Sequence, residues 1–483
     1  MPASRWVRFA EIACLTMYFV WLLWLPLPFG SVIESARLPL IAVPFGLCAI
    51  AGLIRLFATR DRTNLAQPTR AALIWLNGSL LFLATAALQL LPLAPSLLRV
   101  VSPQSFVIWR DASHVASLAG AAVRSSWPVT IDPRATRVEV LRLAAMMATF
   151  LTATLLIRNH ARRRALATVL CGAALFEAFY GLREAALQRF EIWGWVNRLI
   201  FHRVTGTFVN PNHFAHYIVL ILPMALFLGA SLWRKAAPPD TALGRRFALL
   251  VERHALLGGF SVLTTLACLA AILLAQSRGA LLALGIAIVG VAALLPGKRL
   301  ARVALATTSG LLLVLSLALF LGVERTVARF DPGEVESNAV SRRLAMATAV
   351  DLWQRFPVSG SGLGTFERVV WMAQKGDDGH LYHHAHNDYL ELAATGGTPG
   401  IVIGLLTLIG GFAALARMTF GPGSRELTWV RRAFQAAALV SVGAAMVHAL
   451  FDFNFFIPAN PATLAAIAGA AVASVDHDKR TRR

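Results

Sequence analysis

Long apolar stretches alternate with shorter polar segments along most of this 483-residue chain. Many of these stretches have lengths near the roughly 20 residues that a helix needs to cross a bilayer. Twelve of them cover residues 9–29, 36–57, 71–92, 138–157, 165–185, 211–233, 255–275, 279–296, 303–322, 397–416, 433–451 and 459–475. Apolar residues run continuously within them, whereas the strands of a membrane barrel would alternate apolar and polar positions. The pattern therefore predicts an all-α polytopic membrane protein that forms one domain over residues 1–483.

Three of the connecting segments are long enough to hold structure of their own, at residues 93–137, 186–210 and 323–396. The first is rich in Pro and Ser, which favour turns. The second mixes Trp, Phe and Arg, an amphipathic composition suited to the membrane interface. The third lies between the ninth and tenth expected spans and contains a helical apolar repeat from Ser341 to Phe356. Because Pro357 follows, that helix is expected to end there.

Composition supports the membrane assignment and constrains the orientation. Apolar residues make up 57% of the chain and charged residues 14%, against about 25% charged residues in soluble domains. The formal net charge is +20, and nearly all of it falls on one side of the membrane when both termini are placed in the cytoplasm. This asymmetry follows the positive-inside rule, and it leaves no basic patch for nucleic acid. We therefore expect the three long segments on the outer side.

The most distinctive motif begins at His386, where a His-rich polar segment runs into a long apolar helix expected to start near Gly397. The motif consists of His386-Asn387, then nine residues, then Gly-x-x-Gly ending at Gly400. This pattern resembles the signature of the bacterial O-antigen ligase and O-antigen (exopolysaccharide) polymerase superfamily. The resemblance extends over roughly residues 200–460.

The resemblance implies a membrane glycosyltransferase acting at the periplasmic face of the bacterial inner membrane. The implied donor is a glycan on undecaprenyl diphosphate, the acceptor is a sugar hydroxyl, and one-step attack implies inversion at the anomeric carbon. It also implies catalysis without a metal. Zinc is a competing hypothesis, because His380, His383, His384 and His386 lie close together. Their spacing lacks a helical i,i+4 pair with a nearby acid, which argues against a zinc site.

His386 is the histidine that matches the family residue, and the resemblance implies a catalytic role for it. It precedes a helix that enters the membrane, and the positive end of the helix dipole favours a neutral imidazole. A neutral imidazole can act as a general base, although capping or packing would also explain a histidine here. Asp388 and Glu391 lie three apart on one helix face, so either is a candidate to orient His386 or to bind a sugar hydroxyl.

Three arginines are candidates for binding the diphosphate. Arg278 lies in a tight connection between two apolar stretches, where a cation is costly unless it meets an anion or water. An Arg fork holds a phosphate through two hydrogen bonds, and snorkelling to the interface is the alternative. For Arg342 and Arg343, at the start of the helix expected in the third segment, the alternative is a solvated face. The resemblance implies diphosphate contact for Arg278 and favours Arg342 by its spacing to Pro357, although Met346 stands where family members usually have Trp.

Two further polar clusters are candidates for supporting roles. The stretch 206–213 resembles a recurring family segment, and Asn210 is expected to cap the helix that follows it. His213, at the outer end of that helix, is expected to line a cavity without acting in catalysis. His448 and Asp452 are four apart on one helix face and can pair.

Three functions remain open on the sequence. A polymerase would use a second lipid-linked repeat unit as acceptor, and a ligase would use lipid A-core. The stretch 448–460 resembles the C-terminal portion of exopolysaccharide-polymerase-like members, which favours the polymerase. A transporter of lipid-linked glycans would also have many spans, but it predicts discontinuous helices in two matched halves, and the chain shows no such symmetry.

Overall fold

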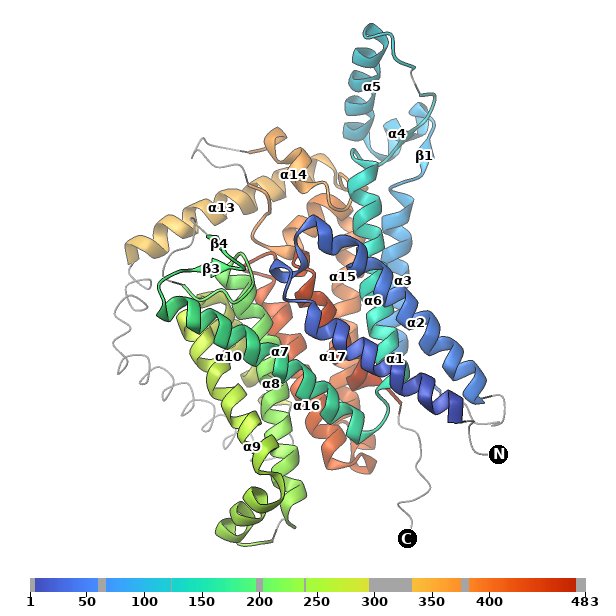
Figure 1. The fold of residues 1–483 in the computed structure, drawn as a ribbon. Coiled ribbons are helices and arrows are strands. Elements are labelled where there is room, and N and C mark those ends of the chain that lie inside the picture. The colour runs from blue at the N-terminus through green and yellow to red at the C-terminus, as the bar shows by residue number, and fades with distance from the viewer. Residues whose placement is uncertain are drawn as a thin grey trace.

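A computed structural model describes residues 5–59, 67–122, 124–196, 203–238, 240–294, 332–374 and 382–474. Within this part of the chain, nine helices are long and apolar enough to cross a membrane. These helices form a bundle (Figure 1) and are α1 (Arg5–Trp24), α2 (Arg37–Thr59), α3 (Arg70–Leu88), α6 (Pro133–Leu156), α7 (His160–Ala186), α8 (Pro211–Ala236), α9 (Leu243–Leu274), α15 (Asp388–Phe420) and α16 (Trp429–His448). Two shorter apolar helices, α10 (Arg278–Ala293) and α17 (Ala459–Val472), lie among them.

The prediction of an all-helical protein with many membrane-spanning helices is confirmed over the described residues. Every predicted span except 303–322 overlaps one of these helices, and 303–322 lies outside the described residues.

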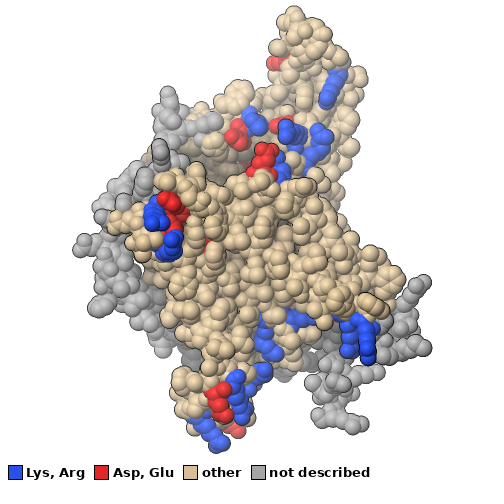
Figure 2. Space-filling view, in the orientation of Figure 1, with Lys and Arg blue, Asp and Glu red and all other residues tan. Residues whose placement is uncertain are grey.

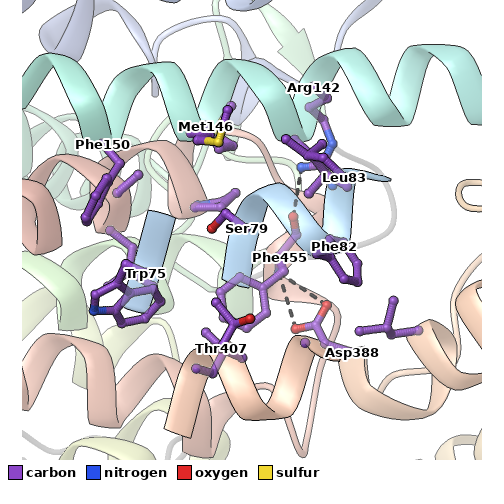
Figure 3. Close-up of a pocket in the computed structure, with 18 of the residues that line it drawn as sticks. Trp75, Ser79, Phe82, Leu83, Arg142, Met146, Phe150, Asp388, Thr407 and Phe455 are labelled. Carbon is purple, nitrogen blue, oxygen red and sulfur yellow. Dashed lines mark hydrogen bonds between the residues drawn. The ribbon is translucent and has the colours of Figure 1, made fainter. Parts of the chain in front are cut away.

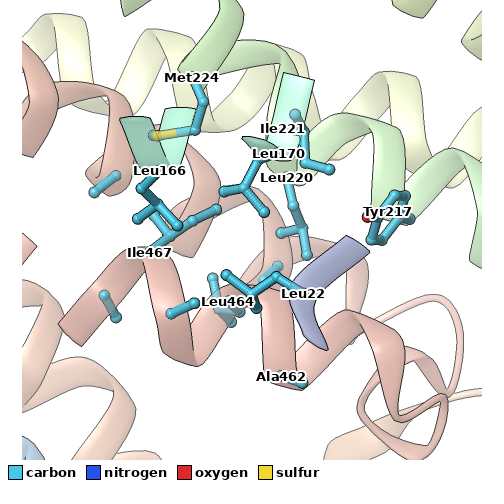
Figure 4. Packing of buried hydrophobic residues seen from close by; sticks show 14 of the residues in the cluster. Leu22, Leu166, Leu170, Tyr217, Leu220, Ile221, Met224, Ala462, Leu464 and Ile467 are labelled. Atoms are coloured by element: carbon cyan, nitrogen blue, oxygen red, sulfur yellow. The ribbon is translucent and has the colours of Figure 1, made fainter. Parts of the chain in front are cut away.

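Helix α8 is buried along almost its whole length and packs against α7, α9, α16 and α17. Leu220 and Ile221 of α8 lie in one apolar cluster with Leu166 of α7 and Ile467 of α17 (Figure 4). A helix that is apolar all round is expected in the interior of such a bundle. In contrast, α1 exposes large apolar side chains such as Phe9, which suits contact with lipid.

One end of the bundle carries the long connecting segments, and we call it the loop end (Figure 1). The described elements of these segments are helices α4 (Pro95–Val101), α5 (Pro103–Leu118), α13 (Pro332–Arg355) and α14 (Phe366–Val369), and strands β1 (Pro92–Leu93), β2 (Trp127–Pro128), β3 (Glu191–Ile192) and β4 (Trp195–Val196). The strands form two antiparallel pairs, β1 with β2 and β3 with β4. Short 3-10 helices cover Phe29–Ser31, Glu34–Ala36, Val370–Met372, Pro422–Glu426 and Asn454–Phe456.

At the opposite end, which we call the terminal end, α1 begins and α17 ends (Figure 1). Arg158 donates a hydrogen bond to the carbonyl of Ser474, and Arg163 and Arg431 donate to that of Ala473. These arginines satisfy carbonyls that the last turn of a helix leaves unpaired. Figure 2 shows Lys and Arg gathered at this end, whereas both signs of charge mix near the loop end.

Two predicted helix boundaries are confirmed. Helix α13 ends at Arg355, directly before Phe356-Pro357, although it begins at Pro332 and not near Ser341. Asn210 caps α8, since its side chain accepts a hydrogen bond of 2.8 Å from the backbone N–H of Asn212.

The predicted start of the apolar membrane helix near Gly397 is confirmed, and a short helical segment precedes it within α15. Helix α15 begins at Asp388, because the side chain of Asn387 accepts hydrogen bonds from the backbone N–H groups of Tyr389 and Leu390. Gly397, with a φ of 66° and a ψ of −176°, divides α15 into this first segment and the membrane helix that follows. A Cβ at Gly397 would lie 2.4 Å from the carbonyl oxygen of Val358. The glycine therefore lets the segment after α13 pack directly on α15.

Candidate functional site at the loop end

The buried carboxylate of Asp452 is the centre of a polar cluster at the loop end. Asp452 follows α16 and is 1% exposed. Its Oδ2 accepts a hydrogen bond of 2.9 Å from Asn212 Nδ2, at the start of α8. Its Oδ1 accepts from the backbone N–H of Phe453 at 3.0 Å and lies 3.3 Å from His386 Nδ1, just before α15. A single carboxylate thus joins three segments that are far apart in sequence.

Two more cationic or titratable groups face this carboxylate. Arg342 Nη2, near the middle of α13, lies 3.7 Å from Asp452 Oδ2, and its Nη1 donates to the carbonyl of Phe451 at 2.7 Å. His213 Nε2 lies 3.7 Å from Asp452 Oδ1. Burial alone would raise the pKa of Asp452, but His213, His386 and the charge of Arg342 together hold that pKa well below its usual range. Asp452 is therefore an anion at neutral pH.

The local backbone fixes the position of His386. Its φ is 51°, a left-handed value that is uncommon outside glycine. The next residue, Asn387, caps α15 and also donates from Nδ2 to the carbonyl of Leu450 at 3.1 Å. The His386 ring meets the Phe453 ring edge to face, with centroids 5.1 Å apart. With Nδ1 donating to Asp452, Nε2 of a neutral ring carries the lone pair.

The acids expected to orient His386 have other partners. Glu391 Oε1 lies 2.9 Å from His384 Nδ1, and Glu391 Oε2 accepts from the backbone N–H of Ala385 at 2.8 Å. Asp388 accepts from the backbone N–H of Phe455 at 3.2 Å. The prediction that Asp388 or Glu391 orients His386 is therefore wrong, because both carboxylates stabilise the backbone around the site. Asp452 makes the contact with His386 that was predicted for Asp388 or Glu391.

His384 forms a second histidine–carboxylate pair beside the first. Its ring stacks on Phe453 with centroids 4.1 Å apart, so Phe453 separates it from His386. Burial would lower the pKa of His384, but the adjacent charge of Glu391 and its hydrogen bond raise that pKa overall. The pair anchors the segment carrying His386, and it is an ion pair when the His384 ring is protonated.

The predicted pairing of His448 with Asp452 is also wrong at the side-chain level. His448 Nδ1 lies 2.9 Å from His216 Nδ1, and the hydrogen bond between His448 and Asp452 is a backbone one, from the Asp452 N–H to the His448 carbonyl. A Cβ on Gly279 would lie 3.0 Å from His448 Nε2. The glycine therefore allows the start of α10, with Arg278, to approach the end of α16 closely.

The three arginines that were predicted to bind the diphosphate differ in their exposure and in their position in the structure. Arg342 is half-buried and contacts Asp452 directly, whereas Arg343, the next residue on α13, is exposed. Arg278 is half-buried at the first position of α10, which Ser277 caps. The structure thus brings Arg342, His386 and Asp452 into contact and places Arg278 on the neighbouring helix start.

Arg203 is a residue that the sequence interpretation missed. Its Nε donates to the carbonyl of Ala275 at 2.9 Å, and its Nη2 donates to Asn212 Oδ1 at 3.0 Å. Asn212 in turn donates to Asp452, so Arg203 connects the α9–α10 turn to the carboxylate. The available signal was an arginine directly before the polar block at 206–213.

The histidines that were considered as zinc ligands contact different partners. His383 Nδ1 lies 3.0 Å from Glu367 Oε1, His384 faces Glu391 and His386 faces Asp452. His380 lies outside the described residues. Over the part of the chain that the structure describes, no group of three or more His, Cys, Asp or Glu side chains is arranged to hold a metal ion.

Fold and site together define a multi-pass membrane protein in which a histidine and an arginine meet a buried carboxylate at one end of the helix bundle. Residues 263–405 match the family model described as O-antigen ligase. This segment is therefore similar to the domain shared by O-antigen ligases and polymerases, a family whose members transfer lipid-linked glycans. No curated protein matches the chain. The match includes Arg278, Arg342 and His386 and ends before Asp452.

Proposed function

We propose that the protein transfers a glycan from undecaprenyl diphosphate to an acceptor sugar hydroxyl, in the bacterial inner membrane, at its periplasmic face. The observation that carries the proposal is the contact of His386 with the ionised Asp452, beside Arg342, at one end of a membrane bundle. The Lys- and Arg-rich terminal end is then cytoplasmic by the positive-inside rule. The loop end, with the site, faces the periplasm.

In this proposal His386 is the general base. Nδ1–H donates a hydrogen bond to Asp452, so the lone pair on Nε2 is available to take the proton from the acceptor hydroxyl. The acceptor oxygen forms a new bond to the anomeric carbon while the bond from that carbon to the diphosphate oxygen breaks. The bonding electrons leave with the diphosphate, and the configuration at the anomeric carbon inverts.

Cationic groups stabilise the leaving diphosphate in this scheme. Arg342 is held beside His386 by Phe451 and Asp452, and Arg278 approaches from the start of α10. Guanidinium forks match phosphate oxygens, and donors aimed at developing charge are a large source of catalysis. Arg343 would contribute long-range attraction for the anionic donor. No step in this scheme requires a metal.

The acceptor molecule distinguishes a polymerase from a ligase. We favour a polymerase, whose acceptor is a second lipid-linked repeat unit, because the polymerase-like stretch 448–460 supplies Asp452 and Phe453 to the site. The alternative is a ligase with lipid A-core as acceptor, and the description of the matched family model favours it.

Complementation in two hosts tests the proposal. The wild type and His386→Ala are expressed in a polymerase-null and in a ligase-null strain, each carrying the native repeat-unit pathway. Long glycan restored only by the wild type in the first strain supports a polymerase, and capped lipid A-core restored only in the second supports a ligase. His383→Ala is the matched control, since His383 is exposed and contacts Glu367. Equal activity of His386→Ala would refute the proposed mechanism and favour a transporter.

A further inference from the structure

Four helices line an apolar cavity next to the polar cluster. The cavity has a volume of about 270 Å³ and lies between α3, α6, α15 and α17 (Figure 3). Trp75 and Phe150 lie at one end of it, and Arg142 and Asp388 lie at the other (Figure 3). Between Glu139 and Phe150 its wall follows α6 for about 16 Å, at 1.5 Å per residue. The cavity is therefore elongated along the membrane helices.

The polar end of the cavity carries no excess positive charge. Arg142 donates from Nε to Glu139 Oε2 at 2.8 Å and from Nη1 to the carbonyl of Phe455 at 2.8 Å. Asp388, the other charged residue there, accepts from the Phe455 backbone. Two carboxylates around one guanidinium leave no excess positive charge for a diphosphate. This end therefore admits an uncharged chain and not an anionic head group.

A short segment separates the cavity from the proposed catalytic groups. In the stretch 452–456, Asp452 and Phe453 contact His386, while Phe455 and Phe456 line the cavity. Helix α15, which starts beside His386, also supplies Asp388, Leu392 and Leu405 to the cavity wall. A molecule whose head reaches His386 thus has an apolar cavity immediately beside it.

We propose that this cavity holds part of the polyprenyl chain of a lipid-linked glycan. The inference rests on the proposed function, because that function requires such a chain close to His386. Apolar cavities bind apolar molecules, and one of about 150 Å³ already takes benzene in place of water. Aromatic rings and the flexible side chains of Met146 and Met147 line the cavity, and methionine adapts to the irregular outline of a methyl-branched chain.

Photolabelling of the full-length protein in lipid nanodiscs tests the inference. One probe is a polyprenyl diphosphate with a diazirine in its chain, and the other is a phospholipid with a diazirine in an acyl chain. Leu405→Trp fills the cavity, whereas Leu406→Trp, the matched control on the same helix, changes a side chain that is 67% exposed. We expect the polyprenyl probe to label α3, α15 and α17, and unlabelled polyprenyl diphosphate to compete. Leu405→Trp should reduce this labelling about tenfold, since losing two or more buried methylene groups costs that much affinity.

Three results would overturn the inference. These are labelling of the cavity by the phospholipid probe alone, no labelling of the cavity by either probe, and equal labelling of Leu405→Trp and Leu406→Trp. Glycan transfer is measured on the same samples. If transfer depends on His386 but the cavity is not labelled, the inference fails and the proposed function stands. If the cavity is labelled but no glycan is transferred, the chain site stands and the proposed function fails.

Discussion

His386 and Asp452 are 66 residues apart in the chain, and His386 Nδ1 lies 3.3 Å from Asp452 Oδ1. His386 lies within the segment matched by the O-antigen ligase family model, whereas Asp452 lies beyond it, after α16. The C-terminal helices therefore complete the site. Without them, the imidazole would have neither its orientation nor the anion that stabilises it when it is protonated.

The first prediction concerns Asp452. Asp452→Asn keeps the shape of the side chain and removes the charge, so His386 loses its fixed tautomer. We expect kcat to fall by about 10² to 10⁴, as for the carboxylate of other histidine–carboxylate pairs, with a smaller change in KM for the lipid-linked donor. Steady-state kinetics of the purified protein measure both. Asp351→Asn, on the partly exposed Asp351–Arg355 pair of α13, is the control and should keep normal rates. Unchanged kcat in Asp452→Asn would contradict the positioning role.

A second prediction separates the two adjacent arginines of α13. Arg342→Ala removes a guanidinium held at the site and should lower kcat/KM about 100-fold, the usual cost of one preorganised charge-stabilising donor. Arg343→Ala removes an exposed side chain and should cost less than about tenfold, through weaker long-range attraction. Raising the salt concentration should reduce only the Arg343 effect. Equal losses in both variants would show that α13 contributes general positive charge and not a specific contact.

Stability at different pH values tests the His384–Glu391 pair. The folded-state pKa of His384 is raised above its ordinary value of about 6.5. The protonated ring therefore stabilises the fold fully below the unfolded-state pKa, and this contribution disappears as the pH rises through the folded-state pKa. His384→Gln should lower the melting temperature more at pH 5.5 than at pH 9. A difference that is the same at both values, or larger at pH 9, would rule out the charged pair.

Two glycine substitutions in α10 test its close approach to α16. In Gly279→Ala the new Cβ would lie 3.0 Å from His448 Nε2, which forces α10 or the buried ring to shift. Gly285 lies on the same helix with no atom within 4 Å of its would-be Cβ, so Gly285→Ala should be neutral or stabilising by up to about 1 kcal/mol. We expect Gly279→Ala to lower both melting temperature and activity. If it behaves like Gly285→Ala, the contact with His448 is not tight.

The sequence predicted those features that depend on local signals. Hydropathy located the membrane helices, Phe356-Pro357 ended α13, and Asn210 capped α8, because each depends on neighbouring residues. It also identified His386 as the candidate base. The start of the apolar part of α15 near Gly397 was also predicted, whereas the preceding segment from Asp388, with its polar first turn capped by Asn387, lay outside the span that hydropathy defined.

The partners of the charged groups could not be predicted in the same way. Asp388 and Glu391 are close to His386 in sequence, yet the contact of His386 is made by Asp452, after α16, and that of His448 by His216, on α8. Such pairs depend on how α8, α15 and α16 pack, and short sequence spacing carries no information about that packing. Arg203 was missed for the same reason, since its partners lie on the α9–α10 turn and on α8.

The most direct test of the central claim is release of undecaprenyl diphosphate by the purified protein in nanodiscs, with a lipid-linked repeat unit as the only glycan. We expect one undecaprenyl diphosphate to be released per bond formed in the wild type and in His383→Ala, and both products to be lost in His386→Ala. Bond formation at the wild-type rate in His386→Ala would show that His386 is not the base and would contradict the account.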